Sequence, residues 1–433
     1  MFFLKHFNKK LNVLMSGNSI KDYSIAKKIS TSPYLNKLYF WGKNKAILEF
    51  AENIGDIPTP EIKNFLKEKK IDLVIDQSEG ELCIGTFDIF RYYYNIPTIG
   101  VSKKWCQLES SKHFSKQFMN RNNILTPDFT LIESIEDYNK IEKDFGYPVV
   151  IKQNSFFRGF GSFIAKNREE AINIIEENLK TGHYDYKDEE TPNRLLIEKF
   201  IEGKEVSQML MWDGKTMKPF CPVRDYKRAG NNNTGKNTGG MGAIAPIPLT
   251  EKEKSLIDEY VKQLSKALKK ERAIDFTGII YAGLMFSGDK LYTLEYNIRM
   301  GDPEAQVLIE HLDSDLLEIF YLLAKRKVNK IDIKYKEGVA LGVIIADKDY
   351  VKNNIDPISR TIKLPKERNL TYLFHNSINP NNEIEYHIAG RILTICNNDV
   401  KNPATAIYKE IEKLQALNDN IYYRTDIGKE FLE

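Results

Sequence analysis

The segment Leu294-Glu-Tyr-Asn-Ile-Arg-Met-Gly-Asp-Pro-Glu-Ala-Gln306 carries three polar side chains at alternate positions. They are the carboxylate of Glu295, the amide of Asn297 and the guanidinium of Arg299. Side chains two residues apart lie on one face of a strand, and the apolar, β-prone residues before the segment predict a strand pair. Two oxygen ligands beside a fixed cation suit Mg²⁺ carrying a polyphosphate, with the arginine neutralising a phosphoryl group in transfer.

Composition limits the classes of protein to which the chain can belong. At 433 residues and 42% hydrophobic content it can bury several cores, which predicts two to four domains. The 63 basic and 60 acidic residues are interspersed and give a net charge of +3, so neither a nucleic-acid surface nor a membrane-binding face is expected. No apolar run reaches the roughly 18 residues that span a bilayer.

Two further features predict a cytoplasmic protein. Residues 1–10 are too short and too quickly polar for a signal peptide. Cys83, Cys106, Cys221 and Cys396 are scattered without metal-ligand or redox spacing, so we expect four reduced thiols.

Strand and helix patterns alternate along the chain. Apolar runs at 11–16, 37–41 and 71–75 predict strands, and the residues at 21–30 and 59–69 predict helices between them. This βαβ order implies a parallel sheet. Further expected elements are a helix over 107–122 capped by Ser110 or Ser111, two strands within 148–165 around a glycine turn, a long Gly/Asn loop over 231–242, strands at 339–346 and 392–396, and a helix over 405–417.

Three central motifs could bind a nucleotide or an anion. Lys152 ends a β-branched run before a glycine turn, where it could hold phosphate, although that segment alone favours an ordinary solvated lysine. Glu198 and Glu205 have a spacing that suits an adenine amine and a ribose diol, and a plain surface hairpin explains them equally well. The glycines within 234–242 predict a backbone-lined anion cradle.

Taken together, these pieces resemble known families. Lys112, Lys152, Glu198 to Glu205, and Glu295 with Asn297 follow an order that is similar to the nucleotide site of the ATP-grasp superfamily. More narrowly, the chain resembles the phosphoribosylamine–glycine ligase family nearly end to end, through Gln107-Leu-Glu-Ser-Ser-Lys-His-Phe-Ser-Lys-Gln-Phe-Met119, Asp225-Tyr-Lys-Arg228, Asn237-Thr-Gly-Gly-Met-Gly242, Arg299-Met-Gly-Asp-Pro-Glu304, Gly390-Arg-Ile-Leu393 and Tyr423-Arg-Thr-Asp-Ile-Gly428.

The resemblance implies an α/β fold of three parts. These are an N-terminal Rossmann-like (pre-ATP-grasp) domain over 1–108, a central ATP-grasp α+β unit over 109–335 with a mobile lid at about 125–200, and a small C-terminal α/β domain over 336–433.

It also implies ATP and Mg²⁺ as cofactors, with Mn²⁺ as an alternative ion, and a set of site residues. The implied ATP-binding residues are Lys112, Lys152, Arg158, Gly159, Gly161, Glu198, Lys199, Phe200, Ile201 and Glu205. The implied metal ligands are Glu295 and Asn297, and the implied catalytic residues are Arg299, Asp225, Lys227 and Asp302. The implied substrate-binding residues are Gly17, Asn18, Glu79, Arg228, Asn237, Thr238, Gly239, Gly240, Met241 and Gly242.

Departures from the family pattern gather where the amine substrate is expected. The family's Gly-Asn-Gly-Gly-Arg-Glu-His-Ala reads here Gly17-Asn-Ser-Ile-Lys-Asp-Tyr-Ser24, and its Gly-Pro-Glu-Ala-Pro-Leu reads Gln77-Ser-Glu-Gly-Glu-Leu82. Ser19 and Ile20 add Cβ bulk where backbone should approach a phosphate. In the lid, Gly-Lys-Gly reads Gly159-Phe160-Gly161, and Arg158 could replace the missing cation.

Three functions follow from this mixture. The first is an ATP-dependent carboxylate–amine ligase of the parent type, which forms an amide through an acyl phosphate and releases ADP and phosphate. The second is a paralogue that joins glycine or another small carboxylate to a different amine outside purine synthesis. The third is a nucleotide-binding protein without turnover. In each case we expect only small-molecule partners, no nucleic acid or membrane, and a monomer or weak dimer.

Overall fold

The computed structural model describes residues 7, 9–55, 62–155, 161–180, 194–352 and 358–429. Its first part alternates strands and helices as predicted. The elements are β1 (Leu11–Ser16), α1 (Ile20–Ser30), β2 (Leu35–Trp41), η1 (Lys45–Glu49), β3 (Glu52–Asn53), α2 (Ile62–Glu68), β4 (Leu73–Ile75), α3 (Glu79–Ile84), α4 (Thr86–Asp88), η2 (Ile89–Tyr93) and β5 (Thr98–Val101). Strands β3, β2, β1, β4 and β5 lie side by side in that order and pair in parallel, so the predicted parallel sheet is confirmed.

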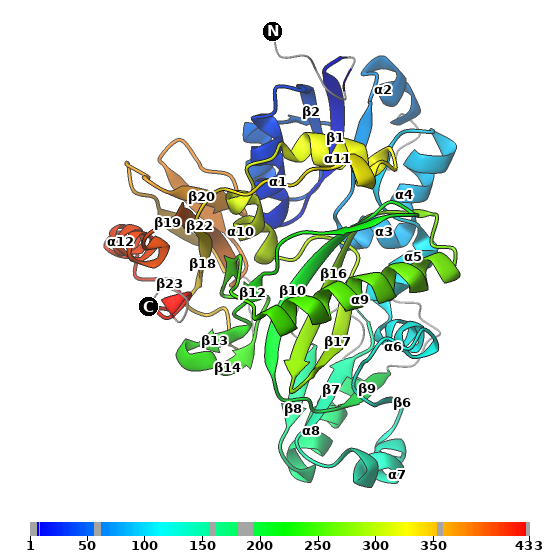
Figure 1. The fold of residues 1–433 in the computed structure, drawn as a ribbon. Helices are drawn as coiled ribbons and strands as arrows, with labels where there is room; N and C mark the ends of the chain where they lie inside the picture. The colour runs from blue at the N-terminus through cyan, green and yellow to red at the C-terminus, as the bar shows by residue number, and fades with distance from the viewer. Residues whose placement is uncertain are drawn as a thin grey trace.

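This parallel sheet continues into the middle of the chain. Its last strand, β5, pairs antiparallel with β16 (Phe276–Ser287), which also pairs with β10 (Lys204–Trp212) and β17 (Lys290–Asn297); β11 (Met217–Pro219) lies beyond β10. The result is one nine-stranded sheet. Helix α9 (Glu251–Lys270) crosses this sheet (Figure 1) and begins at Thr250, whose hydroxyl accepts from the N–H of Glu253 at 3.2 Å.

The predicted helix over 107–122 is wrong in one respect, because the chain breaks at Ser111. Two helices result, α5 (Lys103–Ser110) and α6 (Lys112–Arg121). The Ser111 hydroxyl accepts from the N–H of Phe114 at 3.2 Å and so caps α6, as one of the two predicted caps. The break turns Lys112 into the first residue of a new helix.

A second, four-stranded sheet stands apart from the nine-stranded one. Its order is β6 (Phe129–Ile132), β9 (Leu195–Lys199), β7 (Val149–Gln153), β8 (Ser162–Ala165), and helices α7 (Ile135–Phe145) and α8 (Arg168–Lys180) pack with it. It has its own core, built around Ile132, Tyr138, Val149 and Ile197, and lies at the lower end of the molecule (Figure 1).

The C-terminal part of the chain and two strands from its middle build a six-stranded antiparallel sheet. It runs β12 (Arg224–Asp225), β15 (Gly242–Ala245), β18 (Val339–Asp347), β22 (Arg391–Asp399), β20 (Thr371–Phe374), with β23 (Ile421–Tyr422) on β18. Helices α10 (Glu304–His311) and α12 (Pro403–Gln415) pack on this sheet, and β19 (Arg360–Lys363) pairs with β21 (Glu383–Tyr386). Helix α11 (Leu316–Ala324) instead packs against α1 and the nine-stranded sheet. Residues 231–242, expected as one long loop, instead form a 3₁₀ turn and the strand β14 (Thr234–Asn237), which pairs with β13 (Arg228–Gly230).

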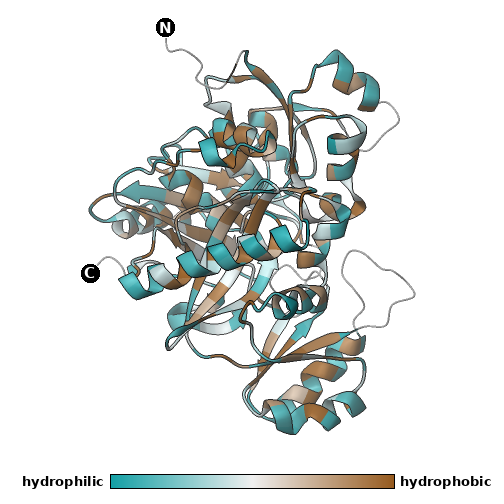
Figure 2. Ribbon diagram, turned by 45° about the vertical axis from the view of Figure 1, so that its right-hand side comes forward, coloured by the Kyte–Doolittle hydropathy of each residue, from teal (hydrophilic) through white to brown (hydrophobic). Residues whose placement is uncertain are grey.

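Hydrophobic residues concentrate on the strands, while the visible surface of α9 is mostly hydrophilic (Figure 2). None of the helices in the described ranges is long and apolar enough to cross a membrane. The prediction of four reduced cysteines is wrong for two of them, since Cys83 at α3 and Cys106 at α5 form a disulfide. Helix packing brings together two residues 23 positions apart, which spacing alone does not reveal.

Candidate functional site

The alternation predicted for the opening segment is present in β17. Glu295 and Asn297 are partly exposed, whereas Tyr296 between them is buried. The strand ends at Asn297, but the alternation continues beyond it, with Arg299 partly exposed between the buried Ile298 and Met300. The carboxylate, the amide and the guanidinium therefore share one face at the end of the strand.

Lysines from two elements converge on the buried carboxylate of Glu198. Glu198 Oε2 lies 2.9 Å from Lys152 Nζ on β7 and 3.1 Å from Lys116 Nζ on α6. Lys116 also donates to the hydroxyl of Thr126 at 2.7 Å. Both lysines contact Oε2, whereas Glu198 Oε1 is buried and has no hydrogen-bond partner among the described residues, so Oε1 and the main chain of residues 199–201 remain available to a ligand.

Burial shapes the titration of the same cluster. It lowers the pKa of Lys112 to about 8, a shift that the charge of Glu295 opposes. It also lowers the pKa of Lys116 to about 8, against the attraction of Glu198. Buried cations of this kind are stabilised when an anion arrives beside them.

Glu295 lies within the field of four cations. Burial would raise the pKa of its carboxyl, but Lys227, Lys152, Lys112 and Arg299 together hold it below its ordinary value. The carboxylate is thus ionised at neutral pH. Together with the Asn297 amide it could bind a divalent cation. The described ranges contain no group of three or more His, Cys, Asp or Glu side chains placed for a metal, so such an ion would also be coordinated by a bound phosphate.

Arg299 is fixed by Glu109, a residue of α5 that sequence reasoning did not select. Its Nη2 lies 3.0 Å from Glu109 Oε1, while Glu109 Oε2 accepts from the N–H of Ile298 at 2.8 Å. One carboxylate therefore orients both the guanidinium and the backbone that carries it.

Asp225 belongs to a buried acidic pair. Burial and the nearby carboxylate of Glu304 raise its pKa well above the ordinary value. Its Oδ1 is buried and has no hydrogen-bond partner among the described residues. Glu304 accepts from the hydroxyl of Ser207 at 2.9 Å, and that hydroxyl also lies 2.9 Å from the Tyr281 hydroxyl. A side chain at Gly240 would collide with Asp225 Oδ1 and with Pro303.

Two cations lie beside this pair. Lys227 Nζ lies 2.9 Å from Glu205 Oε2, and although burial opposes it, Glu205 is the first of several acidic groups that raise the pKa of Lys227 well above its ordinary value. Arg391 on β22 donates to the carbonyl of Gly239 at 2.6 Å and lies 3.1 Å from Asp302 Oδ1. Arg391 was not selected from the sequence, although it stands in a motif that carried the resemblance.

The glycine-rich segment is less of an anion cradle than its composition predicts. The N–H of Gly239 donates to the hydroxyl of Tyr350 at 3.1 Å, and that of Gly240 to the hydroxyl of Thr238 at 3.0 Å. The N–H of Met241 donates to the carbonyl of Tyr226 at 2.9 Å. These groups fold the segment against the site, so the expected cradle of free N–H groups is wrong at these three positions.

A clasp, formed by residues 422–428, holds the β13–β14 hairpin that follows Lys227. Arg424 is 1% exposed, stacks on the Tyr226 ring at 5.2 Å and donates to the carbonyl of Arg228 at 3.1 Å. Its Nε and Nη2 both pair with Asp426, which in turn accepts from the N–H of Asn232 at 2.7 Å. The contacts of residues 422–428 therefore help to fix the positions of Lys227 and Arg228.

The first glycine loop is closed by its own helix. The Asp22 carboxylate accepts from the N–H groups of Asn18 at 2.8 Å and Ser19 at 3.0 Å. Lys21 is 2% exposed and donates to Asp22 at 3.0 Å and to the carbonyl of Gln77 at 2.9 Å. The side chain of Ile20, which was expected to obstruct a ligand, is 1% exposed and packs in the main core.

The other predicted residues take the following places. Arg158 and Gly159 lie outside the described residues. Gly161 precedes β8, Lys199 ends β9, and Phe200 and Ile201 lie in the loop before β10. Gly17 follows β1, Glu79 begins α3, and Gly242 begins β15. Asn237 ends β14, and its side-chain amide donates to the Ser162 carbonyl at 3.2 Å. Lys116 was missed, although its i,i+4 spacing from Lys112 on one helix face was a readable signal.

Comparison with known proteins shows the family to which the chain belongs. Two family models match the chain: Phosphoribosylglycinamide synthetase, N domain, over residues 11–109, and Phosphoribosylglycinamide synthetase, ATP-grasp (A) domain, over residues 110–305. The phosphoribosylamine–glycine ligase of Fusobacterium nucleatum is 32% identical over 428 residues, which cover 96% of this chain and 98% of that protein. That of Clostridium acetobutylicum is 30% identical and is covered completely.

Solved structures resemble the fold as a whole. A phosphoribosylamine–glycine ligase from Thermotoga maritima superposes with a TM-score of 0.79 at 24% identity, over 96% of this chain and 100% of the other. The biotin carboxylase domain of 2-oxoglutarate carboxylase from Hydrogenobacter thermophilus, solved with MgADP, gives a TM-score of 0.68 at 17% identity, over 96% and 92%.

Proposed function

Because this chain belongs to the phosphoribosylamine–glycine ligase family of ATP-grasp C–N ligases, we propose that it joins glycine to phosphoribosylamine with cleavage of ATP to ADP and phosphate. The substrates are those in the names of its relatives. One observation carries the proposal most directly: the ionised Glu295 lies among Lys112, Lys152, Lys227 and Arg299, which is the arrangement that a metal-bound polyphosphate requires.

The nucleotide would bind between the four-stranded sheet, which carries Lys152 on β7, and β17 of the nine-stranded sheet, which carries Glu295, with Lys112 at the start of α6. Lys112 and Lys152 would contact its phosphates, with Arg158 and the glycines at 159 and 161 closing over them. Lys116 and Lys152 hold Glu198 Oε2, so adenine would be read by Glu198 Oε1 and by the main chain of residues 199–201, with Glu205 on the ribose hydroxyls. Mg²⁺, with Mn²⁺ as an alternative, would be held by Glu295 and Asn297 and would neutralise charge on the phosphates.

The reaction follows from the electrophilicity of the carboxylate. An oxygen of the glycine carboxylate attacks the terminal phosphorus of ATP, the bond to ADP breaks, and an acyl phosphate forms. The amine nitrogen then attacks the acyl carbon, phosphate leaves, and the nitrogen loses a proton. Arg299, held by Glu109, stabilises the charge that moves onto the acyl phosphate.

The acidic pair would recognise the ammonium group of a small amino acid. Asp225 Oδ1 is buried without a partner among the described residues, and Gly240 leaves no room for added bulk beside it. Lys227, Asp302, Asn237, Thr238 and the glycines around Met241 would frame the same space, with Arg228 at its edge. A buried, unsatisfied acceptor binds a cationic donor strongly.

A second candidate is a ligase for a different amine, favoured by the changes in residues 17–24, which we call the acceptor loop, and in residues 77–82. Ser19 and Gln77 differ from the family pattern, and Gln77 is committed to the N–H of Met300 at 3.0 Å. Against this, Ile20 packs in the core, and Lys21 with Asp22 retains the charges of the family's Arg-Glu. In either case we propose that Gly17, Asn18 and Glu79 would contact the acceptor.

The deciding experiment is a phosphate-release assay with ATP, Mg²⁺ and glycine, with freshly generated phosphoribosylamine compared against a panel of amines. We expect efficient formation of glycinamide ribonucleotide. Turnover with another amine only would establish the second candidate, and ATP binding without turnover in any arm would establish a non-catalytic nucleotide-binding protein.

The remaining proposals concern context. We propose domain limits at 108 and 335 with a lid at about 125–200, a monomer or weak dimer, a cytoplasmic location and no nucleic-acid or membrane partner. Light scattering on the purified protein tests the oligomeric state, and gel shifts with random-sequence DNA and RNA test the absence of nucleic-acid binding.

A further inference from the structure

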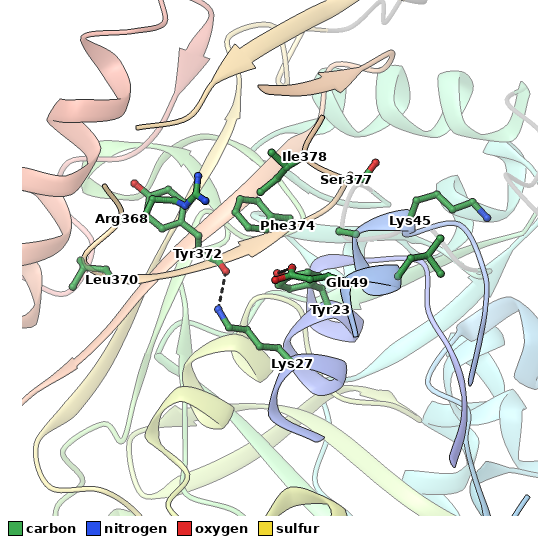
Figure 3. Close-up of a pocket in the computed structure, with 12 residues that line it drawn as sticks. Tyr23, Lys27, Lys45, Glu49, Arg368, Leu370, Tyr372, Phe374, Ser377 and Ile378 are labelled. Atoms are coloured by element: carbon green, nitrogen blue, oxygen red, sulfur yellow. Dashed lines mark hydrogen bonds between the residues drawn. The ribbon is translucent and has the colours of Figure 1, made fainter. Parts of the chain in front are cut away.

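A cavity of about 590 Å³ lies apart from the nucleotide and acceptor residues. Figure 3 shows it between α1 with η1 on one side and β20 with the residues before and after it on the other. No residue assigned above to ATP, metal or substrate lines it. Its volume falls within the range of small-molecule sites.

The floor of this cavity is aromatic. Tyr23, Tyr372 and Phe374 are 1%, 3% and 5% exposed and line it. Tyr23 and Phe374 meet edge to face with ring centroids 5.6 Å apart. Such a floor offers ring faces and edges to a planar ligand.

The rim is cationic. Lys27, Lys45 and Arg368 line it beside a single carboxylate, Glu49, which already accepts from the Tyr23 hydroxyl at 2.8 Å. The three cations donate only to carbonyl or amide oxygens within the part of the chain that the structure describes; Lys27 reaches the Tyr372 carbonyl at 3.3 Å, drawn dashed in Figure 3. None of the described salt bridges includes them, so their charge is available to an anion.

The cavity is also connected to the acceptor loop through Asn44, which is 1% exposed. Asn44 Nδ2 donates to the carbonyl of Phe374 at 3.0 Å in the cavity wall and to the carbonyl of Ser19 at 2.8 Å. A ligand that shifts β20 or η1 would therefore shift the backbone of Ser19.

We propose that this cavity is a regulatory site for a small aromatic anion, a planar ring that carries one phosphate or carboxylate group. The ring packs on Tyr372 and Phe374, and the anionic group lies among Lys27, Lys45 and Arg368. A ligand bound in the cavity shifts the backbone of the acceptor loop through the two hydrogen bonds of Asn44. The binding part of this inference is independent of the proposed ligase activity.

The test uses the whole protein with its nucleotide site filled by MgADP. Ligand-observed NMR compares phenyl phosphate, benzoate, inorganic phosphate and phenol. We expect phenyl phosphate or benzoate to saturate at about 1–10 mM, with inorganic phosphate and phenol binding much more weakly. The first two distinguish phosphate from carboxylate as the preferred group.

Two variants localise the binding. Lys45→Met with Arg368→Met should weaken it about fivefold or more, and Leu48→Trp should block it by filling the cavity while it keeps every charge. Lys262→Met, an exposed lysine on α9, is the control and should bind as the unmodified protein does. Equal binding in all variants, or no binding of either aromatic anion, overturns the site.

Regulation has its own readout. Phenyl phosphate should change backbone hydrogen exchange at residues 18–23 in the unmodified protein, and Asn44→Ala should abolish that change without abolishing binding. Binding with unchanged exchange at these residues overturns the regulatory part.

Discussion

The nucleotide side and the acceptor side of the site differ in how their charges are balanced. On the nucleotide side two buried lysines, Lys116 and Lys152, share the single carboxylate of Glu198, and desolvation lowers the pKa of Lys112 and Lys116 to about 8. On the acceptor side, Lys21 pairs with Asp22 and is satisfied within the loop. The nucleotide side is arranged to receive an anion, whereas the charge of Lys21 on the acceptor side is already balanced by Asp22.

This difference predicts where substitutions act. Changes among the surplus cations should alter ligand binding and turnover with modest effects on folding. Changes in the satisfied loop should alter local stability first. The following substitutions and the pH series test that separation.

The largest effect is expected for Glu295→Gln. It removes a carboxylate that lies in the field of four cations, so kcat should fall by about 10²–10³-fold, while the affinity for free ATP stays equal or rises because a competing negative charge is gone. Glu202→Gln, an exposed glutamate before β10, is the control. A near-normal rate at low Mg²⁺ would place the metal elsewhere.

Lys152→Met comes next. ATP binding measured by calorimetry should weaken by about 1.5–3 kcal/mol, the scale of a hydrogen bond to a charged group. The fold should survive because Lys116 remains 3.1 Å from the buried Glu198 carboxylate. Unchanged affinity in a folded variant would remove Lys152 from the phosphate site.

A pH series should separate binding from folding. Above pH 8 the unliganded Lys112 and Lys116 lose their protons, and since ATP favours the ammonium forms, affinity should fall by up to about tenfold per pH unit per lysine. Binding at pH 8–9 should take up protons, which calorimetry in buffers of different ionisation enthalpy measures. Lys112→Met should flatten the profile; a wild-type profile that is already flat would contradict these pKa shifts.

The same lysines affect folding in the opposite sense. Their pKa in the fold lies below the 10.5 of an ordinary lysine, so the unfolded chain holds more protons between pH 8 and 10.5. Their contribution to the free energy of unfolding should therefore rise with pH across that window. Urea titrations of the unliganded protein check the sign.

The smallest effect is expected for Ser19→Gly on the acceptor side. The substitution keeps the N–H that donates to Asp22 and loses only the hydroxyl, so it should cost a few tenths of a kcal/mol, the usual order for glycine at a helix N-cap. ATP affinity should stay within about twofold because the nucleotide lysines are untouched. A large change in ATP affinity would show that the two sides are not separate.

Sequence patterns predicted those parts of the molecule that depend on local spacing. The β17 face follows from period-two alternation, and the parallel sheet follows from the βαβ order. The break at Ser111 was hidden because the residues on both sides are compatible with one helix. The join between β5 and β16 depends on residues 175 or more positions apart, which no local pattern reports.

The charged partners of the site could not be predicted for the same reason. Glu109 meets Arg299 only because α5 packs beside β17, and Arg391 reaches Asp302 from a strand of another sheet. The prediction of free N–H groups in the glycine-rich segment was wrong at Gly239, Gly240 and Met241, because oxygens of Tyr350, Thr238 and Tyr226 accept from them. Composition shows which groups are present, but tertiary contacts decide which remain available.

The clasp has a consequence for the timing of synthesis. Arg424 donates to the carbonyl of Arg228 across 196 residues of chain, and Asn231 pairs with Thr425 across 194. A ribosome must therefore make the hairpin long before it makes the residues that anchor it. A nascent or prematurely stopped chain would carry every residue proposed for the nucleotide, yet would lack the anchor of Lys227 and Arg228, so competence for the reaction should arrive only near the end of translation.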